Sequence, residues 1–257
     1  MRNALLNMPE SKTREPGYTA SAGVESSQQS SHRRLPEYVQ RHMNSHWQSP
    51  PHAATVLAFD RLQGLLQPGE FQHLVLDSGC GTGFSTRCLA GMHPDCVVIG
   101  VDKSSARLAR TGSHELPHRE GNCIWVRGEL ASFWRLARES GWHLFKHFLL
   151  YPNPWPRPGH LKRRWHGHPV FPTLMALGGE IEMRSNWEIY AQEFAMAAGL
   201  VTGLDIQVER LAVEQPLSPF EKKYLSSGHA LFSVRFAVDK MSPGCPGLNT
   251  ATKVHSS

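Results

Sequence analysis

Asp77-Ser78-Gly79-Cys80-Gly81-Thr82-Gly83 is the stretch that decides the fold, because it lies between the apolar run Leu74-Val75-Leu76 and a helical pattern over residues 84–90. Glycines at alternate positions let the chain turn tightly after a strand and let a ligand approach the backbone. The free amides at the start of the next helix can hold an anionic group. The following apolar run, 97–101, ends at Asp102, about twenty residues beyond the glycines, where a carboxylate can accept hydrogen bonds from ribose hydroxyls.

The spacing of this turn is GxGxG rather than the GxGxxG of dinucleotide sites, and an acidic residue, Asp77, precedes it. A negative charge there suits a cationic ligand better than a pyrophosphate. S-adenosylmethionine carries an ammonium and a sulfonium group, so Asp77 favours it on charge grounds. The alternative is an ordinary strand-to-helix turn in which Asp77 and Asp102 only cap the ends of strands.

Short apolar runs alternate with amphipathic helical patterns along the chain, which is typical of βαβ units. We therefore expect a Rossmann-like, doubly wound α/β fold, with a mostly parallel seven-stranded sheet and an antiparallel closing strand. The expected strands are 74–76, 97–101, 123–126, 144–150, 180–183, 204–212 and 230–238. The expected helices are 53–66, 84–90, 104–110, 130–139 and 186–198, the last of them capped by Asn186.

Composition sets the domain boundaries. The chain has 257 residues, 40% of them hydrophobic, which is enough for one substantial core. Residues 1–30 are rich in Ser, Gln and Gly and residues 240–257 in Pro and Gly, so we expect two disordered tails around one domain, 31–239. The five cysteines form no CxxC pair, and no stretch resembles a signal peptide or a membrane span. We expect a cytoplasmic protein with reduced thiols that does not contact a membrane.

A proline-rich, aromatic loop, 151–158, follows the apolar run 144–150 and leads into a block of positive charge. Seven of the residues from Arg157 to His168 are Arg, Lys or His, with no acidic residue among them. Ligands of open α/β sheets bind at the carboxyl ends of strands, and a ring for base stacking beside cations for phosphates suits a polynucleotide. The net charge of +5 permits such a partner without requiring it.

Each of these features has a simpler alternative. Trp155 could pack under the loop as a core residue, and Lys162-Arg163-Arg164 could be a solvated face. His160, His166 and His168 raise the question of zinc, but no nearby Cys or acidic residue completes a ligand set. We therefore expect no metal.

The motifs together resemble a known family. The 77–83 turn with Asp102 resembles the cofactor site of class I S-adenosylmethionine-dependent methyltransferases. Pro152-Asn153-Pro154-Trp155 and His160-Leu161-Lys162-Arg163-Arg164 are similar to the PDPW and RHxKRR signature of the tRNA (guanine-N7)-methyltransferases. Residues 185–190 resemble the TDxxxY stretch of that family, and residues 218–223 resemble its TxFE motif.

The resemblance implies an enzyme that moves a methyl group from S-adenosylmethionine to N7 of a guanine in tRNA, acting as a monomer or a homodimer. It implies cofactor contacts from the glycine turn and from acidic or amide side chains, with Glu129 near the adenine and Asn153 also in the catalytic role. The implied cofactor contacts are Asp77, Gly79, Gly81, Gly83, Asp102, Glu129 and Asn153. The implied substrate contacts are Trp155, Arg157, His160, Lys162, Arg163, Arg164, Asn186, Ser218, Pro219, Phe220 and Glu221.

The chain departs from the family pattern where the chemistry takes place. Asn153 and Asn186 stand where the family has aspartates, Gly159 replaces an arginine, and Ser218 replaces a threonine. An asparagine can accept a hydrogen bond from guanine but carries no charge. The site could still methylate guanine, with carboxylate support from Glu221 or Glu188. Alternatively, the chain is a weakened or re-targeted protein that binds RNA or methylates a small molecule or a protein.

Overall fold

The computed structural model describes residues 21–45, 47–70, 73–113 and 115–239, so most of the predicted 1–30 tail and the whole of 240–257 lie outside the described residues. Eight strands form one sheet in these residues, in the order β3-β4-β2-β1-β5-β6-β8-β7. The strands are β1 (Leu74–Ser78), β2 (Val97–Asp102), β3 (His118–Glu120), β4 (Cys123–Arg127), β5 (Lys146–Leu150), β6 (Gly179–Ser185), β7 (Val208–Arg210) and β8 (Phe232–Val238).

The central strands β4, β2, β1, β5 and β6 are parallel, and β8 pairs antiparallel with both β6 and β7. The predicted fold class and the antiparallel closing pair are therefore confirmed. The described sheet has eight strands rather than seven because β3 pairs antiparallel with β4 at the edge. This strand has only three residues, none of them fully buried, so it carries no apolar run that would reveal it in the sequence.

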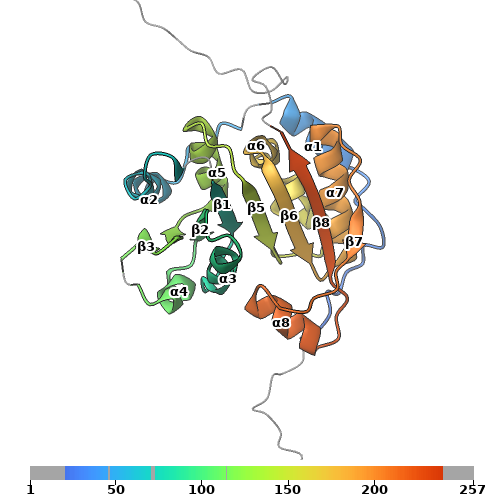
Figure 1. Cartoon of the computed structure of the whole chain (residues 1–257). Coiled ribbons are helices and arrows are strands. Elements are labelled where there is room, and N and C mark those ends of the chain that lie inside the picture. The colour runs from blue at the N-terminus through green and yellow to red at the C-terminus, as the bar shows by residue number, and fades with distance from the viewer. Residues whose placement is uncertain (1–20, 46, 71–72, 114, 240–257) are drawn as a thin grey trace, which may run out of the picture.

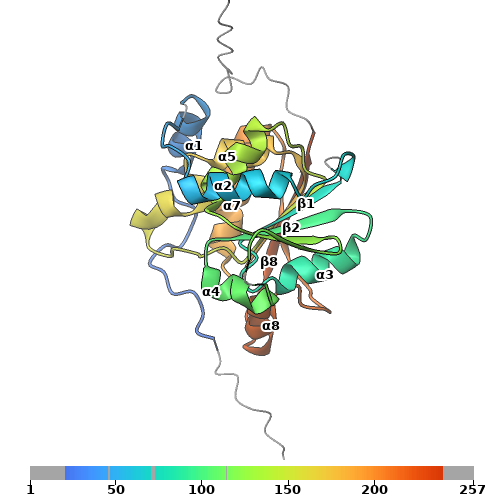
Figure 2. The ribbon, with the colours of Figure 1, turned by 90° about the vertical axis from the view of Figure 1, so that its left-hand side faces the viewer.

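Helices cover both faces of the sheet, with α1, α2, α5 and α7 on one face and α3 and α4 on the other (Figure 2). The α-helices are α1 (Leu35–Met43), α2 (Ala53–Gln63), α3 (Phe84–Met92), α4 (Ser105–Leu108), α5 (Leu130–Glu139), α6 (Phe171–Ala176), α7 (Glu188–Thr202) and α8 (Pro219–Ser226). The short 3-10 helices are η2 (Ala109–Thr111), η3 (Pro158–Arg163) and η4 (Trp165–Gly167).

Strand β1 is buried along its whole length and contributes to a core on each face of the sheet. Leu74 and Leu76 join the larger core with α1, α2, α5, α6 and α7, while Val75 joins the smaller core with α3 and α4. Burial on both faces explains the continuous apolar run, because central parallel strands face no water. The run therefore predicts the strand, but it does not by itself identify its neighbours.

The strand order predicts a ligand-binding position at the carboxyl ends of β1 and β5. The chain passes from β1 to β2 on one side and later to β5 on the other, so the strand order reverses between β1 and β5. Ligands of open α/β sheets bind at the carboxyl ends of the strands at such a reversal. In Figure 1 the arrowheads of β1, β5 and β6 point toward the side of the molecule where α8 lies. The glycine turn and the loop after β5 both begin at this edge.

Candidate cofactor and substrate site

The three glycines of the turn after β1 have left-handed backbone angles, with φ of 86° at Gly79, 59° at Gly81 and 76° at Gly83. The surroundings of these glycines differ. A Cβ on Gly83 would lie 2.6 Å from Thr111 Cγ2 and from Trp125 Nε1, so this position has to be glycine for packing as well as conformation. A Cβ on Gly79 would meet no atom within 4 Å, so this part of the turn borders open space that a ligand could enter.

Asp77 lies at the end of β1 and is almost fully buried. Its Oδ2 accepts hydrogen bonds from Ser85 Oγ at 2.6 Å and from Thr86 Oγ1 at 2.8 Å, both in α3. Its Oδ1 is buried and accepts no hydrogen bond from the described residues. Burial is the main cause that raises the pKa of Asp77 to about 6. A buried carboxylate oxygen that lacks a donor fits a site for a cationic group.

Asp102 closes the turn from the neighbouring strand, β2. Its Oδ2 accepts the Gly81 N–H at 3.1 Å, and its Oδ1 accepts the Ser104 N–H at 2.8 Å. The same Oδ1 lies 3.0 Å from the Arg107 guanidinium, which is partly exposed. Asp77 in β1 and Asp102 in the neighbouring strand β2 therefore both lie beside the same turn. Ribose hydroxyls would compete with Arg107 for Asp102.

Glu129 lies at the end of β4 and is the N-cap of α5. Its two oxygens accept the N–H groups of Ala131 at 2.9 Å and Ser132 at 2.7 Å, and Ser132 Oγ adds a third bond. This is a helix cap of the usual acidic kind, and it accounts for both carboxylate oxygens. The side chain stabilises α5 in this structure, and a contact with adenine remains a prediction.

The loop after β5 holds two non-glycine residues in the left-handed region, Tyr151 at φ 54° and Trp155 at φ 44°. Asn153 lies between them, exposed, and its Oδ1 accepts the Trp155 N–H at 3.3 Å. Left-handed backbone at residues with large side chains is uncommon and tends to occur at functional sites. The sequence shows the prolines of this loop but gives no sign of its strained backbone.

Trp155 is partly buried, so neither the base-stacking nor the core-packing interpretation describes it fully. Its ring meets the His160 ring edge-to-face at 5.6 Å between centroids. The Arg163 guanidinium lies over it at 4.8 Å. The aromatic ring thus lies beside a cation at the carboxyl edge of the sheet.

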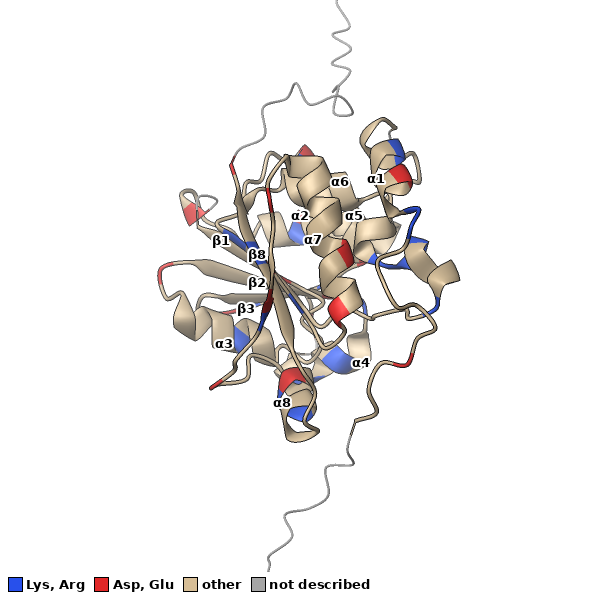
Figure 3. Cartoon of the chain, turned by 90° about the vertical axis from the view of Figure 1, so that its right-hand side faces the viewer, with Lys and Arg blue, Asp and Glu red and all other residues tan. Residues whose placement is uncertain are grey.

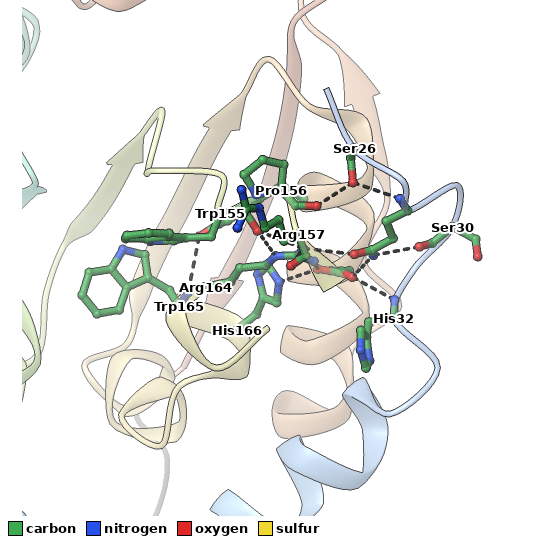
Figure 4. A network of polar contacts seen from close by, with 12 residues as sticks. Ser26, Ser30, His32, Trp155, Pro156, Arg157, Arg164, Trp165 and His166 are labelled. Carbon is green, nitrogen blue, oxygen red and sulfur yellow. Dashed lines mark hydrogen bonds and ion pairs between the residues drawn. The ribbon is translucent and has the colours of Figure 1, made fainter. Parts of the chain in front are cut away.

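The basic run after the loop separates into two parts. Lys162, Arg163 and Arg157 are exposed, as a phosphate-binding role requires. Arg164 is fully buried, so the prediction that it contacts the substrate is wrong. It pairs instead with the buried carboxylate of Glu193 in α7. Figure 4 shows Arg164 within this network of polar contacts. A run of basic letters cannot reveal which of its members points into the protein.

The 218–221 segment forms the start of α8, where Ser218 is the N-cap and accepts the Glu221 N–H at 3.1 Å. Pro219 and Phe220 are exposed. Glu221 is fully buried and its carboxylate accepts hydrogen bonds from Tyr151 Oη at 2.6 Å and Leu217 N at 2.6 Å, and pairs with Arg184 at 2.9 Å. It therefore links the loop after β5 to β6 and α8, and it does not replace the missing family aspartates. Its predicted contact with guanine does not fit this burial.

The prediction that Asn186 caps the following helix is wrong. The helix α7 begins at Glu188, with Trp187 as N-cap and no side-chain cap bond. The Asn186 Nδ2 atom lies 3.3 Å from His229 Nδ1 instead. The turn before α7 is closed by Ser185 Oγ, which accepts the Trp187 N–H at 3.0 Å. Because Ser185 precedes Asn186, either residue could have been the cap on sequence grounds.

The sequence did not identify Glu193, Tyr151 and Arg184, whose polar contacts link the segments at this edge of the sheet. A signal was present for Glu193, because it is the only charged residue in the mostly apolar stretch 190–201. A charge within such a helix is seldom buried unless it is paired. Nothing in the sequence identifies Arg164, 29 residues earlier in the chain, as its partner among several neighbouring cations.

The three histidines of the basic segment do not form one cluster of metal ligands. His166 Nε2 lies 2.8 Å from Glu193 Oε2, whereas the His168 ring packs against Trp47 and Trp165. In the described part of the chain no group of three or more His, Cys, Asp or Glu side chains could hold a metal ion. No helix within these residues is long and apolar enough to cross a bilayer.

A doubly wound sheet with a glycine turn after its first strand, and an acidic residue at the end of each of the two strands beside that turn, defines the class of S-adenosylmethionine-dependent methyltransferases. The chain belongs to a family described as putative methyltransferases, whose profile matches residues 71–234. An antibiotic-related methyltransferase of known structure has the same fold, with a TM-score of 0.50 and 19% identity over 70% of this chain and 94% of that one.

Two curated relatives are named tRNA (guanine-N(7)-)-methyltransferase. The protein of Thiobacillus denitrificans is 28% identical over 180 residues, which cover 63% of this chain and 74% of the relative. The protein of Aquifex aeolicus is 24% identical over 189 residues, which cover 70% of this chain and 61% of the relative. Helix α1 precedes the segment that matches the family profile.

Proposed function

We propose that this protein transfers a methyl group from S-adenosylmethionine to N7 of a guanine in tRNA. The proposal rests on one observation: the glycine turn and the aromatic loop lie next to each other, where the strand order reverses between β1 and β5. The glycine turn follows β1, the aromatic loop follows β5, and these strands are parallel neighbours. A cofactor on the turn and a base on the loop would therefore meet at the carboxyl edge of the sheet. The activity named for the two relatives favours tRNA over a small molecule or a protein as the acceptor.

Asp77, Asp102 and the glycines are the residues that would hold the cofactor. Asp77 Oδ1 is the buried oxygen without a donor, and it would face a cationic group. Asp102 keeps the turn in shape through the Gly81 N–H and can accept hydroxyl groups. When bound, S-adenosylmethionine supplies an electrophilic methyl group on a positively charged sulfur. The two carboxylates favour that charge while the substrate is being aligned.

The loop after β5 would position the guanine. N7 of guanine carries a free lone pair, so no residue has to remove a proton before the attack. The contribution of the protein is alignment, which needs a fixed loop. Asn153, Trp155 and Tyr151 lie in that loop, and Tyr151 is anchored to Glu221 at 2.6 Å. Asn153 can accept one hydrogen bond from the guanine edge through its Oδ1, in place of the aspartate that the family carries.

The cations beside the loop form a surface suited to the RNA backbone. We call it the basic surface and define it as Arg34, which is the N-cap of α1, Tyr38 and Arg41 of α1, and Lys162 and Arg163 of η3. Arg34, Arg41 and Lys162 lie over the Tyr38 ring at 5.1, 5.3 and 5.4 Å.

Figure 3 shows Lys and Arg positions on α1 and on the segments beside it, on one side of the molecule. The acidic residue that pairs with it is Glu37, which lies 2.8 Å from Arg34 and 2.7 Å from Arg41. Four cations against one carboxylate leave a net positive charge, which attracts phosphates and makes binding depend on salt. A tRNA is large enough to contact α1 while one base reaches the loop. Because tRNA is the proposed substrate, the proposal also includes a cytoplasmic location.

The test is methyl transfer to bulk tRNA with labelled S-adenosylmethionine, followed by nucleoside analysis. We expect label in 7-methylguanosine. The control is Asp77→Ala, which removes the carboxylate at the turn and should lose the label. Transfer of label to other nucleosides, or no transfer by the parent protein, would contradict the proposed function.

A further inference from the structure

A fully buried ion pair, Arg164 with Glu193, lies behind the loop after β5. The Arg164 Nη1 and Glu193 Oε2 atoms are 2.5 Å apart, and His166 Nε2 lies 2.8 Å from the same oxygen. Burial opposes the ionised form of Glu193, but the hydrogen bond from His166 and the charge of Arg164 lower its pKa to about 2. Burial lowers the pKa of His166, so a neutral ring donates to an ionised carboxylate. Arg164 and Glu193 are therefore both charged, and each charge is balanced by that of its partner.

The guanidinium of this pair holds the backbone of the loop. Arg164 Nε and Nη2 donate to the Trp155 carbonyl oxygen at 3.2 and 3.1 Å, and Nη2 also donates to the Arg157 carbonyl at 3.3 Å. The carbonyl between them, that of Pro156, accepts from Ser26 Oγ at 2.5 Å. Three consecutive carbonyl groups thus accept hydrogen bonds, two of them from Arg164 and one from Ser26, next to the left-handed φ of 44° at Trp155. Such fixation can offset the strain of that conformation.

The N-terminal segment completes the network, as Figure 4 shows. Gln28 bridges the ion pair, because its Oε1 accepts from Arg164 Nη2 at 3.0 Å and its Nε2 donates to Glu193 Oε1 at 2.5 Å. The His32 N–H donates to the same Glu193 oxygen at 2.8 Å. Ser26 Oγ, which holds Pro156, also accepts the Gln28 N–H at 3.0 Å. Residues 26–32, which composition alone assigns partly to a disordered tail, therefore lie against the loop.

We propose that residues 26–32 are a positioning element of the active site, which acts through Arg164 and Glu193 to fix the backbone of residues 155–157. None of these side chains needs to touch the substrate. The segment lies outside residues 71–234, which match the family profile. The inference rests on the proposed function, because residues 155–157 belong to the loop that would align the guanine.

The double variant Ser26→Ala/Gln28→Ala tests the proposal in the full chain. It removes the side-chain bonds of Ser26 to Pro156 and of Gln28 to Arg164 and Glu193, and it leaves the buried ion pair and the His32 N–H bond to Glu193 intact. The matched control is Ser27→Ala/Gln29→Ala, which makes the same chemical changes at the two exposed neighbours. We expect the kcat for tRNA methylation to fall about ten- to a hundredfold in the test variant. The KM for tRNA and the Kd for the cofactor should stay near those of the parent.

Hydrogen exchange gives a second measurement that does not depend on activity. The amides of Trp155 and Arg157 should exchange faster in the test variant than in the control variant, because the Pro156 carbonyl between them has lost its donor and Arg164 has lost its bond to Gln28. Ser26→Thr retains the hydroxyl and, in combination with native Gln28, should keep both the parent exchange rate and the parent kcat. If the test variant matches its control in exchange or in kcat, the positioning role is overturned. If the parent does not methylate tRNA, the proposed function fails, whereas exchange still decides whether the segment fixes the loop.

Discussion

Asp77 in β1 and Asp102 at the end of the neighbouring strand β2 lie beside the same glycine turn, and the charge of Asp102 adds to burial in raising the pKa of Asp77 to about 6. Asp102 has its oxygens engaged by Gly81, Ser104 and Arg107, whereas Asp77 retains one buried oxygen without a donor. A cation placed at that oxygen would relieve the repulsion between the two acids. The affinity for such a cation should therefore depend on the ionisation of Asp77.

The first prediction is that cofactor affinity rises with pH. With a pKa of about 6, Asp77 is about one-tenth ionised at pH 5 and about nine-tenths ionised at pH 7. The ammonium and the sulfonium of S-adenosylmethionine keep their charges over this range, so the association constant should rise about tenfold. Titration calorimetry at the two pH values measures the change. Asp77→Asn should bind more weakly and without this dependence, and an equal pH dependence in that variant would assign the effect to another group.

The second prediction concerns Asn153. Asn153→Asp keeps an oxygen that can accept the Trp155 N–H, which is 3.3 Å away, and adds a charge toward the guanine. Methylation of tRNA should stay the same or increase. Asn153→Ala removes that acceptor and should lower kcat about ten- to a hundredfold, which corresponds to about 1.5–3 kcal/mol. Steady-state kinetics of the two variants checks both directions. Loss of activity in Asn153→Asp beside an active parent would show that the loop is misaligned with the family motif.

The sequence predicts those parts of this protein that rest on local patterns. The buried strands give continuous apolar runs, and the helix from Leu130 to Glu139 has the predicted bounds because its cap, Glu129, and its apolar face lie close together in the chain. The glycine turn with its two acids also depends on short spacings. The positions of Asp77 and Asp102 beside one turn are therefore predictable without a structure.

The roles that depend on long-range pairing are not predictable in this way. Arg163 and Arg164 are adjacent basic letters, yet one is exposed and the other is fully buried against Glu193. Glu221 belongs to a motif associated with the substrate, but a tyrosine seventy residues earlier and the Arg184 guanidinium occupy its carboxylate. These assignments need the packing of α7 and α8 against the loop, which no local pattern encodes.

The third prediction is that His147 makes the protein sensitive to acid. This side chain is fully buried beside Ser78 Oγ, 2.8 Å from its Nε2 atom, and burial lowers its pKa from 6.5 to about 3. The unfolded chain therefore binds one more proton than the folded chain between these values. The free energy of unfolding should fall by about 1.4 kcal/mol for each pH unit below 6.5 on account of this residue.

Denaturant unfolding at pH 6.5, 5.5 and 4.5 measures that slope. His147→Gln keeps a polar side chain near Ser78 but cannot gain a proton. The variant should be less stable than the parent at pH 7, and its stability should decline less steeply with acid. Parallel curves for the two proteins would mean that another group governs the acid response.

The fourth prediction is that α1 contributes to tRNA binding. Arg34→Ala/Arg41→Ala removes two cations of the basic surface that lie over Tyr38, far along the chain from the catalytic loop. If each contacts one phosphate, the slope of log K against log salt should become less steep by about 1.4–1.8, and binding at low salt should weaken. The control is Arg61→Ala, an exposed arginine of α2 outside the basic surface. Fluorescence titrations with tRNA at several salt concentrations give the slopes. None of the proposed cofactor contacts lies in α1, so the Kd for S-adenosylmethionine should not change. Equal slopes for all three proteins would remove α1 from the RNA-binding surface.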